Sequence, residues 1–343
     1  MSIIASRMFR SALPAKPTRL ASAKLLYFAV AAVAGVLAAL SGHDASAQTT
    51  RTIKIVVPVP AGGGTDFVAR LLGEQISRAR GLTVLIENRP GANGVIATEA
   101  VARAAPDGNT LLMPSGAFVI HAHLRKLNYD PLTSFEPICQ LVSVPAVIAV
   151  NSESPYRTLG DLLNAARTNP GDLTLATSTA TEFHIGFEIL KRTAKIDMTF
   201  IPYPGAAPAV TALLGQHVTS VFYGYPGMAD HLRSGKLRAL ATGARTRIAS
   251  LPDVPTVAES GYKDYELDFW YGVIAPANTP KDAVAQLADW FTTAMRTPEV
   301  IAKLDGQGIY PAGICGAKFG ALIRKEFDEF GRVIREANIK ATE

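Results

Sequence analysis

The chain is poor in cysteine. Its 343 residues include only Cys139 and Cys315. In an oxidising compartment these two thiols can form one disulfide, and they can equally stay as two buried free thiols. Both alternatives stay open on sequence alone, because bridging depends on the distance between the two Cα atoms.

The sequence also lacks the usual marks of a metal or catalytic centre. His121 and His123 would share one face of an extended segment, but neither has a cysteine or an acid nearby at ligand spacing. There is no Gly-x-Ser-x-Gly elbow, no His-Glu-x-x-His pair and no Walker lysine. We therefore expect no metal, no cofactor and no catalysis. A hydrolytic site assembled from distant residues stays as a weaker alternative.

Once the first residues are set aside, the chain has no strong excess of either charge. The formal net charge is +5, and residues 1–47 carry five bases and one acid, which leaves +1 for the remainder. A basic surface for nucleic acid is therefore unsupported, and we expect no nucleic-acid partner.

Long apolar runs are absent except for Leu25 to Leu40. A basic segment precedes this run and Ala45-Ser46-Ala47 follows it, which is the layout of a secretory signal with its cleavage site. The run is shorter than the roughly 20 residues of a membrane-spanning helix. We therefore expect residues 1–47 to be a cleaved signal peptide. With no cysteine at the cleavage site and no paired arginine before the run, Sec-type export of a soluble monomer to the periplasm is the simplest interpretation.

The stretch from Ile53 to Arg70 is the most informative part of the chain. A buried strand, Ile53 to Val57, is followed by three glycines and then by the apolar pattern of a helix from Asp66 onward. Glycines bring the backbone close to a ligand, and Thr65 or Asp66 is placed to cap the helix. A helix N-terminus favours an anion, so this turn predicts a carboxylate or phosphate site. A glycine-rich turn without a ligand is the alternative.

Strand and helix signals alternate in two series, one from Ile53 to Met113 and one from Leu173 to Thr242. Two apolar segments, Val144 to Val150 and Phe269 to Pro276, are expected to cross between the series. Three helices follow Pro280, and the last has an apolar stripe typical of a core contact.

This layout predicts an α/β fold with two lobes, each an open and mainly parallel sheet flanked by helices. Lobe 1 would comprise residues 48–147 and 273–343, and lobe 2 residues 148–272. Strand-to-helix turns of both lobes would face the cleft between them.

Five motifs, taken together and in order, resemble the Bug family, the substrate-binding proteins of tripartite tricarboxylate transporters. They are Pro58–Asp66 (PVPAGGGTD), Glu87–Gly94 (ENRPGANG), Ala105–Leu111 (APDGNTL), Pro202–Gly205 (PYPG) and Trp270–Gly272 (WYG). The resemblance covers essentially the whole mature chain. It implies a type II periplasmic binding protein fold, a small organic carboxylate held partly through ordered water, and delivery to membrane permease subunits.

Carried onto this sequence, the resemblance places ligand contacts in the first-lobe glycine turn, in the loop around residue 115 and in loops of the second lobe. Aromatic rings of the second lobe are further candidates for the cleft wall. The predicted contacts are Ala61, Gly62, Gly63, Thr65, Asp66, Ser115, Gly116, Phe118, Ser178, Thr181, His184, Tyr203, Gly205 and Tyr223.

The second-lobe loop departs from the family pattern. Ser178 and Ala180 stand where the family usually has glycine, and Glu182 adds a negative charge close to the expected anion. Glu182 either points away or meets an amino group on the ligand, so an aromatic or amino carboxylate is a candidate beside the di- and tricarboxylates. His184 either donates to the ligand or fixes its loop by bonding a backbone carbonyl.

A periplasmic sensor that passes its closed form to a membrane histidine kinase is the alternative function.

Overall fold

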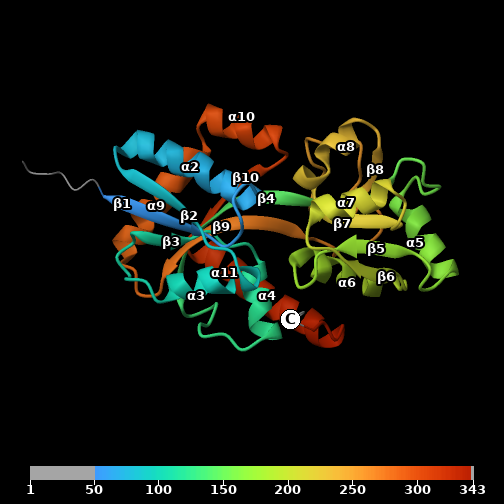
Figure 1. The fold of residues 1–343 in the computed structure, drawn as a ribbon, viewed down its shortest axis with the longest axis horizontal. Coiled ribbons are helices and arrows are strands. Elements are labelled where there is room, and N and C mark those ends of the chain that lie inside the picture. The colour runs from blue at the N-terminus through green and yellow to red at the C-terminus, as the bar shows by residue number, and fades with distance from the viewer. Residues whose placement is uncertain (1–50, 341–343) are drawn as a thin grey trace, which may run out of the picture. The chain divides into compact units, whose positions relative to one another are not determined.

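A computed structural model describes residues 51–340, which form alternating strands and helices (Figure 1). The predicted signal peptide, residues 1–47, lies outside the described residues. Among residues 51–340, no helix is both long enough and apolar enough to cross a bilayer.

The first sheet is built on β1 (Thr52–Val57), which pairs in parallel with β2 (Thr83–Asn88) and β3 (Thr110–Leu112). Both faces of β1 are buried. Ile55 belongs to the core under α2 (Gly64–Arg80), whereas Val56 belongs to the core on the opposite face. Strands covered on both faces read as continuous apolar runs, which is why the sequence signal here is strong.

The long strand β4 (Phe135–Asn151) joins the two sheets. Its first part pairs antiparallel with β9 (Asp268–Pro276) in the first sheet, as far as Pro145. From Ala146 onward it pairs antiparallel with β7 (Ser220–Gly224) and β8 (Leu237–Thr242) in the second sheet. The predicted crossing segment, residues 144–150, therefore lies within this longer strand and spans the point where it changes partner.

The second sheet repeats the strand and helix alternation. Its strand β5 (Thr174–Thr177) pairs in parallel with β6 (Thr199–Pro202) and with β7. Thr158 caps the helix that follows β4 through a complete capping box with Asp161. The helices of this part of the chain are α5 (Leu159–Thr168), α6 (Glu182–Ala194), α7 (Ala206–Leu214) and α8 (Ala229–Arg233).

The remaining helices cover the two faces of the first sheet (Figure 1). Alongside α2 lies α9 (Lys281–Met295), and α10 (Pro298–Gly306) contacts both of them. On the other face α11 (Ala317–Glu336) packs with α4 (Ala117–Leu124), next to α3 (Val95–Ala102). The predicted apolar stripe of α11 is core, since Phe319, Ile323 and Phe330 are all buried. The predicted two-lobed α/β fold is confirmed, with antiparallel pairing confined to the crossing strands and their neighbours.

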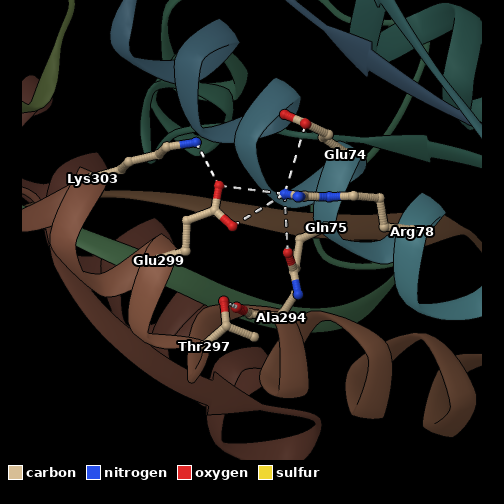
Figure 2. Close-up of polar contacts among 7 residues, drawn as sticks. All are labelled: Glu74, Gln75, Arg78, Ala294, Thr297, Glu299 and Lys303. Atoms are coloured by element: carbon tan, nitrogen blue, oxygen red, sulfur yellow. Dashed lines mark hydrogen bonds and ion pairs between the residues drawn. The ribbon is translucent and has the colours of Figure 1, made fainter.

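Polar contacts fasten α10 to α2 at the surface (Figure 2). Arg78 of α2 lies 3.4 Å from the carboxylate of Glu299, which also pairs with Lys303 at 2.8 Å. All three side chains are about half exposed, so each pair stabilises the fold by no more than about 1 kcal/mol.

A disulfide ties β10 (Tyr310–Cys315) to β4. Strand β10 was not predicted from the sequence. Cys315 lies opposite Cys139 in the antiparallel register of β10 and β4, with their Cα atoms 4.0 Å apart. Of the two alternatives left open by the sequence, the bridged one is correct. The bridge closes a sequence separation of 176 residues.

Removing the disulfide should destabilise the protein. We expect the double change Cys139→Ala and Cys315→Ala to lower the free energy of unfolding by about 2–4 kcal/mol, since the unfolded chain regains the freedom of a very long loop. Urea unfolding of residues 48–343 measures the difference. A reductant should move the wild-type midpoint towards that of the double variant and leave the variant unaffected. Equal midpoints for the oxidised wild type and the variant would contradict the prediction.

Candidate functional site

A cavity of about 700 Å³ lies where loops of the two sheets meet. Its walls come mainly from the segments that follow β1, β2, β3, β5 and β6, which are the carboxyl ends of the parallel strands. Open α/β sheets bind ligands at this edge. The lining residues are Pro58, Val59, Pro60, Pro90, Gly91, Ala92, Asn93, Gly94, Thr98, Pro114, Ser115, Ala117, Phe118, His121, Ser178, Thr179, Ala180, Thr181, Glu182, Phe183, Pro202, Tyr203, Pro204 and Phe269.

Five of the predicted ligand contacts line this cavity, namely Ser115, Phe118, Ser178, Thr181 and Tyr203. Two others adjoin it, because Gly116 lies between lining residues and the Tyr223 hydroxyl is 3.1 Å from the Ser178 hydroxyl. The predicted contacts outside the lining are Ala61, Gly62, Gly63, Thr65, Asp66, Gly116, His184, Gly205 and Tyr223.

The cavity also contains residues absent from the predicted contacts. The turn Pro90–Gly94 had a signal, since it is the second glycine-containing turn after a strand. His121 and Phe269 had none, because their place depends on how α4 and the crossing strand β9 pack. Phe183 of α6 and Phe269 of β9 stack with ring centroids 4.9 Å apart, so the helix and the crossing strand build one aromatic wall together.

The first-lobe glycine turn forms the start of α2, although its cap differs from the prediction. Gly63 occupies the N-cap position and no side chain caps the helix, so neither Thr65 nor Asp66 is the cap. Gly62 has a φ of +90°, which a residue with a side chain rarely adopts. Gly64 lies against the ring of Tyr271, where an added Cβ would be 2.7 Å from the hydroxyl.

Asp66 holds this turn together from inside the helix. One carboxylate oxygen accepts hydrogen bonds from the Gly62 N–H and from Arg70 Nε, both at 2.9 Å. The other oxygen accepts one from the Asn88 side chain at 2.9 Å, which connects the turn to the end of β2. Burial acts to raise the pKa of Asp66, but these hydrogen bonds keep that pKa below its usual value. The carboxylate therefore shapes the turn beside the cavity.

In the second-lobe loop the backbone keeps a left-handed conformation at a residue that is not glycine. Ala180 has a φ of +57°. Its N–H donates to His184 Nδ1 at 3.3 Å, and the His184 ring stacks on Phe200 with centroids 4.1 Å apart. Burial lowers the pKa of His184 to about 4, so the ring is neutral and can accept this bond. His184 thus fixes its loop, which was one of the two alternatives predicted from the sequence. The bond differs from the predicted one, because His184 accepts from the Ala180 N–H and the prediction was a bond to a backbone carbonyl.

The two histidines near residue 122 are not a pair. Both lie on helix α4 and not on an extended segment, so a spacing of two residues puts them on different faces. His121 is buried and lines the cavity, and burial lowers its pKa to about 4. His123 packs on Phe327 of α11, and the two are joined by a 2.8 Å contact between Nε2 and the Phe327 carbonyl. Within residues 51–340 there is no group of three or more His, Cys, Asp or Glu side chains arranged to hold a metal ion.

Glu182 connects the two lobes at the cavity. It is the first residue of α6 in the second lobe, and its Oε1 accepts a hydrogen bond of 2.9 Å from the backbone N–H of Ala117, the first residue of α4. Gly116 makes room for this contact, because a Cβ there would lie 3.0 Å from Oε1. Burial raises the pKa of Glu182 to about 7, although hydrogen bonds such as that from Ala117 act in the opposite direction.

A second buried carboxyl lies close to the first. Glu326 of α11 accepts hydrogen bonds of 2.9 Å from Trp270 Nε1, and a Cβ on Gly116 would be 3.1 Å from its Oε2. Burial raises the pKa of Glu326 to about 8, and the nearby Glu182 raises it further. Neither carboxyl has an ion-pair partner among the described residues.

These shifts predict a loss of stability on the alkaline side of neutrality. Both glutamates keep protons in the folded state at pH values where the unfolded chain has lost them, so their contribution disappears as pH rises through about 7 to 8. The buried neutral His121 and His184 act in the opposite direction, but only below their unfolded pKa of about 6.5. We therefore expect the free energy of unfolding to fall between about pH 6.5 and 8.5, by at most roughly 1.4 kcal/mol per pH unit for each glutamate.

Chemical unfolding at a series of pH values measures this slope. Glu326→Gln, which keeps an acceptor for Trp270 and cannot ionise, should make the slope shallower. The matched change Glu336→Gln is made on the same helix at a residue that does not act on the pKa of Glu326. It should leave the slope as it is. Stability that stays level or rises over this pH range would contradict the assignment.

Comparison with known proteins gives a consistent result. The model of the tripartite tricarboxylate transporter family receptor matches residues 68–339. The protein BugT of Bordetella pertussis is 32% identical over 317 residues, which covers 90% of this chain and 97% of BugT.

Solved structures agree with the fold. The periplasmic binding protein BugD superimposes with a TM-score of 0.72 at 32% identity, covering 85% of this chain and 99% of BugD. An R. palustris protein solved with adipate superimposes with a TM-score of 0.75 at 30% identity, again covering 85% and 99% of the two chains. These similarities confirm the periplasmic binding protein fold with two lobes. The chain belongs to the receptor family of the tripartite tricarboxylate transporters, as the resemblance of its motifs to the Bug proteins predicts.

Proposed function

We propose that the mature chain is a periplasmic solute-binding protein that captures a small organic carboxylate between its lobes and delivers it to the membrane permease subunits of a tripartite transporter. The observation that carries this proposal is the cavity itself, which is lined by both lobes at the carboxyl ends of their strands. Receptors of this family are binding proteins, so the prediction that the chain is not an enzyme is confirmed by its family.

The helix starts around the cavity favour an anion. Three helices begin at its wall: α3 after Gly94, α4 at Ala117 and α6 after Thr181. Their first N–H groups have no partner within the helix and carry the positive end of its dipole. Main-chain N–H groups of this kind bind carboxylates without a basic side chain, which agrees with the absence of Lys and Arg from the lining. The adipate in the related structure is a carboxylate of suitable size.

The pairing of β4 supports the proposed division into lobes. Because β4 changes partner between Pro145 and Ala146, a boundary near residue 147 agrees with the sheet topology. The pairing of β9 with the first part of β4 begins at Asp268 and favours a second boundary a few residues before 272. Closure would then bend the chain at these two crossings.

Thermal unfolding of residues 48–343 in the presence of candidate solutes tests the proposal. The panel contains dicarboxylates, tricarboxylates, aromatic acids and amino acids. A true ligand at about one hundred times its dissociation constant should add roughly 2.7 kcal/mol of stability. The ligand should also be recovered unchanged. Turnover of a bound acid, or no stabilisation by any member of the panel, would count against a carboxylate receptor.

A substitution in the first-lobe turn tests the site. Asp66→Ala removes the acceptor that holds Gly62, Arg70 and Asn88, so we expect it to weaken binding of the identified acid by about 10-fold or more. The control is Asp289→Ala. Asp289 is an exposed acid on α9 and pairs with Arg80 at the end of α2, away from the glycine turn. Equal affinities for wild type, D66A and D289A would argue against a role for this turn.

A further inference from the structure

The cavity wall carries one carboxyl group and no cationic side chain. Among the described residues that line it, Glu182 is the sole member of the Asp, Glu, Lys and Arg class, and the remaining titratable groups are His121 and Tyr203. His121 is neutral, because burial lowers its pKa to about 4. A receptor for dicarboxylates would be expected to offer both ends of its ligand an anion site, and here a carboxylate already stands at one of them.

Glu182 occupies the anion-binding end of α4. The oxygen that accepts from the Ala117 N–H is where a ligand carboxylate would lie if it were bound by this helix start. The neighbouring Gly116 has no side chain, and the carboxyl groups of Glu182 and Glu326 come close to the position that its Cβ would occupy. The protein thus supplies from its second lobe a carboxylate at a first-lobe site, and this leaves the helix starts of α3 and α6 for the solute.

The Glu182 carboxyl has hydrogen-bond donors around it but no cation. Its Oε2 is buried without a partner of good hydrogen-bond geometry within the described part of the chain, although the Ser115 hydroxyl and the Gly116 N–H lie close enough to lower the pKa of the carboxyl. Around it, burial raises the pKa of Glu326 of α11 to about 8 and that of Tyr271 of β9 to about 12, and burial keeps His121 of α4 neutral, so none of these three groups is a cation. A second ligand carboxylate here would be repelled, whereas a cation within roughly 4–6 Å would be attracted through an apolar wall even without direct contact.

The wall between the two ends is apolar. Phe183 and Phe269 stack on each other, and Phe118 packs edge-on against Phe135 at a centroid distance of 6.2 Å. Prolines from four segments, those that follow β1, β2 and β3 and the one at the end of β6, complete this part of the lining. Such a surface suits the methylene chain or ring that joins two polar ends of a solute.

We propose, on the basis of the function proposed above, that Glu182 is a specificity-determining residue that selects a monocarboxylate with an ammonium group at its far end and excludes dicarboxylates of the same length. The main-chain N–H groups hold the ligand carboxylate, and Glu182 faces the ammonium group. The amino carboxylate among the candidate solutes is therefore the class that this cavity favours.

Matched pairs of acids test the proposal. Titration calorimetry at about pH 8, where Glu182 is largely ionised, compares 6-aminohexanoate with adipate and 5-aminopentanoate with glutarate. In the wild type we expect each amino acid to bind at least about 10-fold more tightly than its dicarboxylate partner. Glu182→Gln keeps an oxygen for the Ala117 N–H and removes the charge, so this ratio should fall to about one.

Glu188→Gln is the matched control. Glu188 lies on the same helix, pairs with Lys191 at 3.3 Å and is absent from the cavity lining. The ratio measured for wild type should persist in E188Q, and unfolding curves show whether each variant is folded.

The outcomes separate this inference from the function it rests on. Dicarboxylates that bind the wild type as tightly as their amino partners would overturn the role of Glu182 and leave the carboxylate receptor standing. A preference for the amino partner that survives in E182Q would overturn it as well. If none of the four acids binds, the inference fails, and the wider thermal panel then decides whether the receptor function fails with it.

Discussion

The fold depends on one strand that belongs to two sheets. β4 pairs with β9 up to Pro145 and with β7 and β8 from Ala146 onward, so β1, β2 and β3 run in the direction of β4 while β5, β6 and β7 run against it. The parallel strands on either side must then present their carboxyl ends, and the helix starts that follow them, to the same space. The disulfide at Cys139 secures the first part of β4 to the C-terminal strand. The position of the cavity thus follows from the pairing and direction of the strands, independently of the side chains that line it.

Side chains near the cavity mainly hold backbone in place. Asp66 binds the N–H of Gly62, and His184 accepts from the N–H of Ala180. The buried Glu182 accepts from Ala117 in the same way. A site of this kind holds the ligand carboxylate with main-chain groups, so that contact depends on the shape of the loops more than on residue type. That is why the family and the general site follow from the motifs, whereas the solute does not.

The sequence predicts local structure well where one local signal is sufficient. The alternation of apolar strands with helices and the positions of the glycine turns are both recognisable from neighbours in the chain. Strand β10 and the first part of β4 were missed because their stability comes from pairing with each other and with β9, far away in sequence. Helix α4 was missed for a similar reason, since its buried face is defined by α11. The ligand contacts predicted in the first-lobe glycine turn lie beside the cavity and not in its lining. The glycines of that turn set the course of the backbone, while the preceding residues Pro58, Val59 and Pro60 line the cavity.

The charge of Glu182 is the feature in which sequence and structure have to be combined. From the sequence, an acid beside an expected anion site is a conflict that the side chain could avoid by pointing away. In the structure Glu182 instead lies at a helix N-terminus, where the dipole and the Ala117 N–H favour a negative charge while burial opposes it. A buried acid with one oxygen left without a partner is destabilising by roughly 1–3 kcal/mol unless something compensates it. Within the described chain no cation does so, and the cavity is the side from which one can arrive. An acid in the wall of an anion receptor is therefore accounted for if the ligand itself carries a positive charge that compensates the carboxylate.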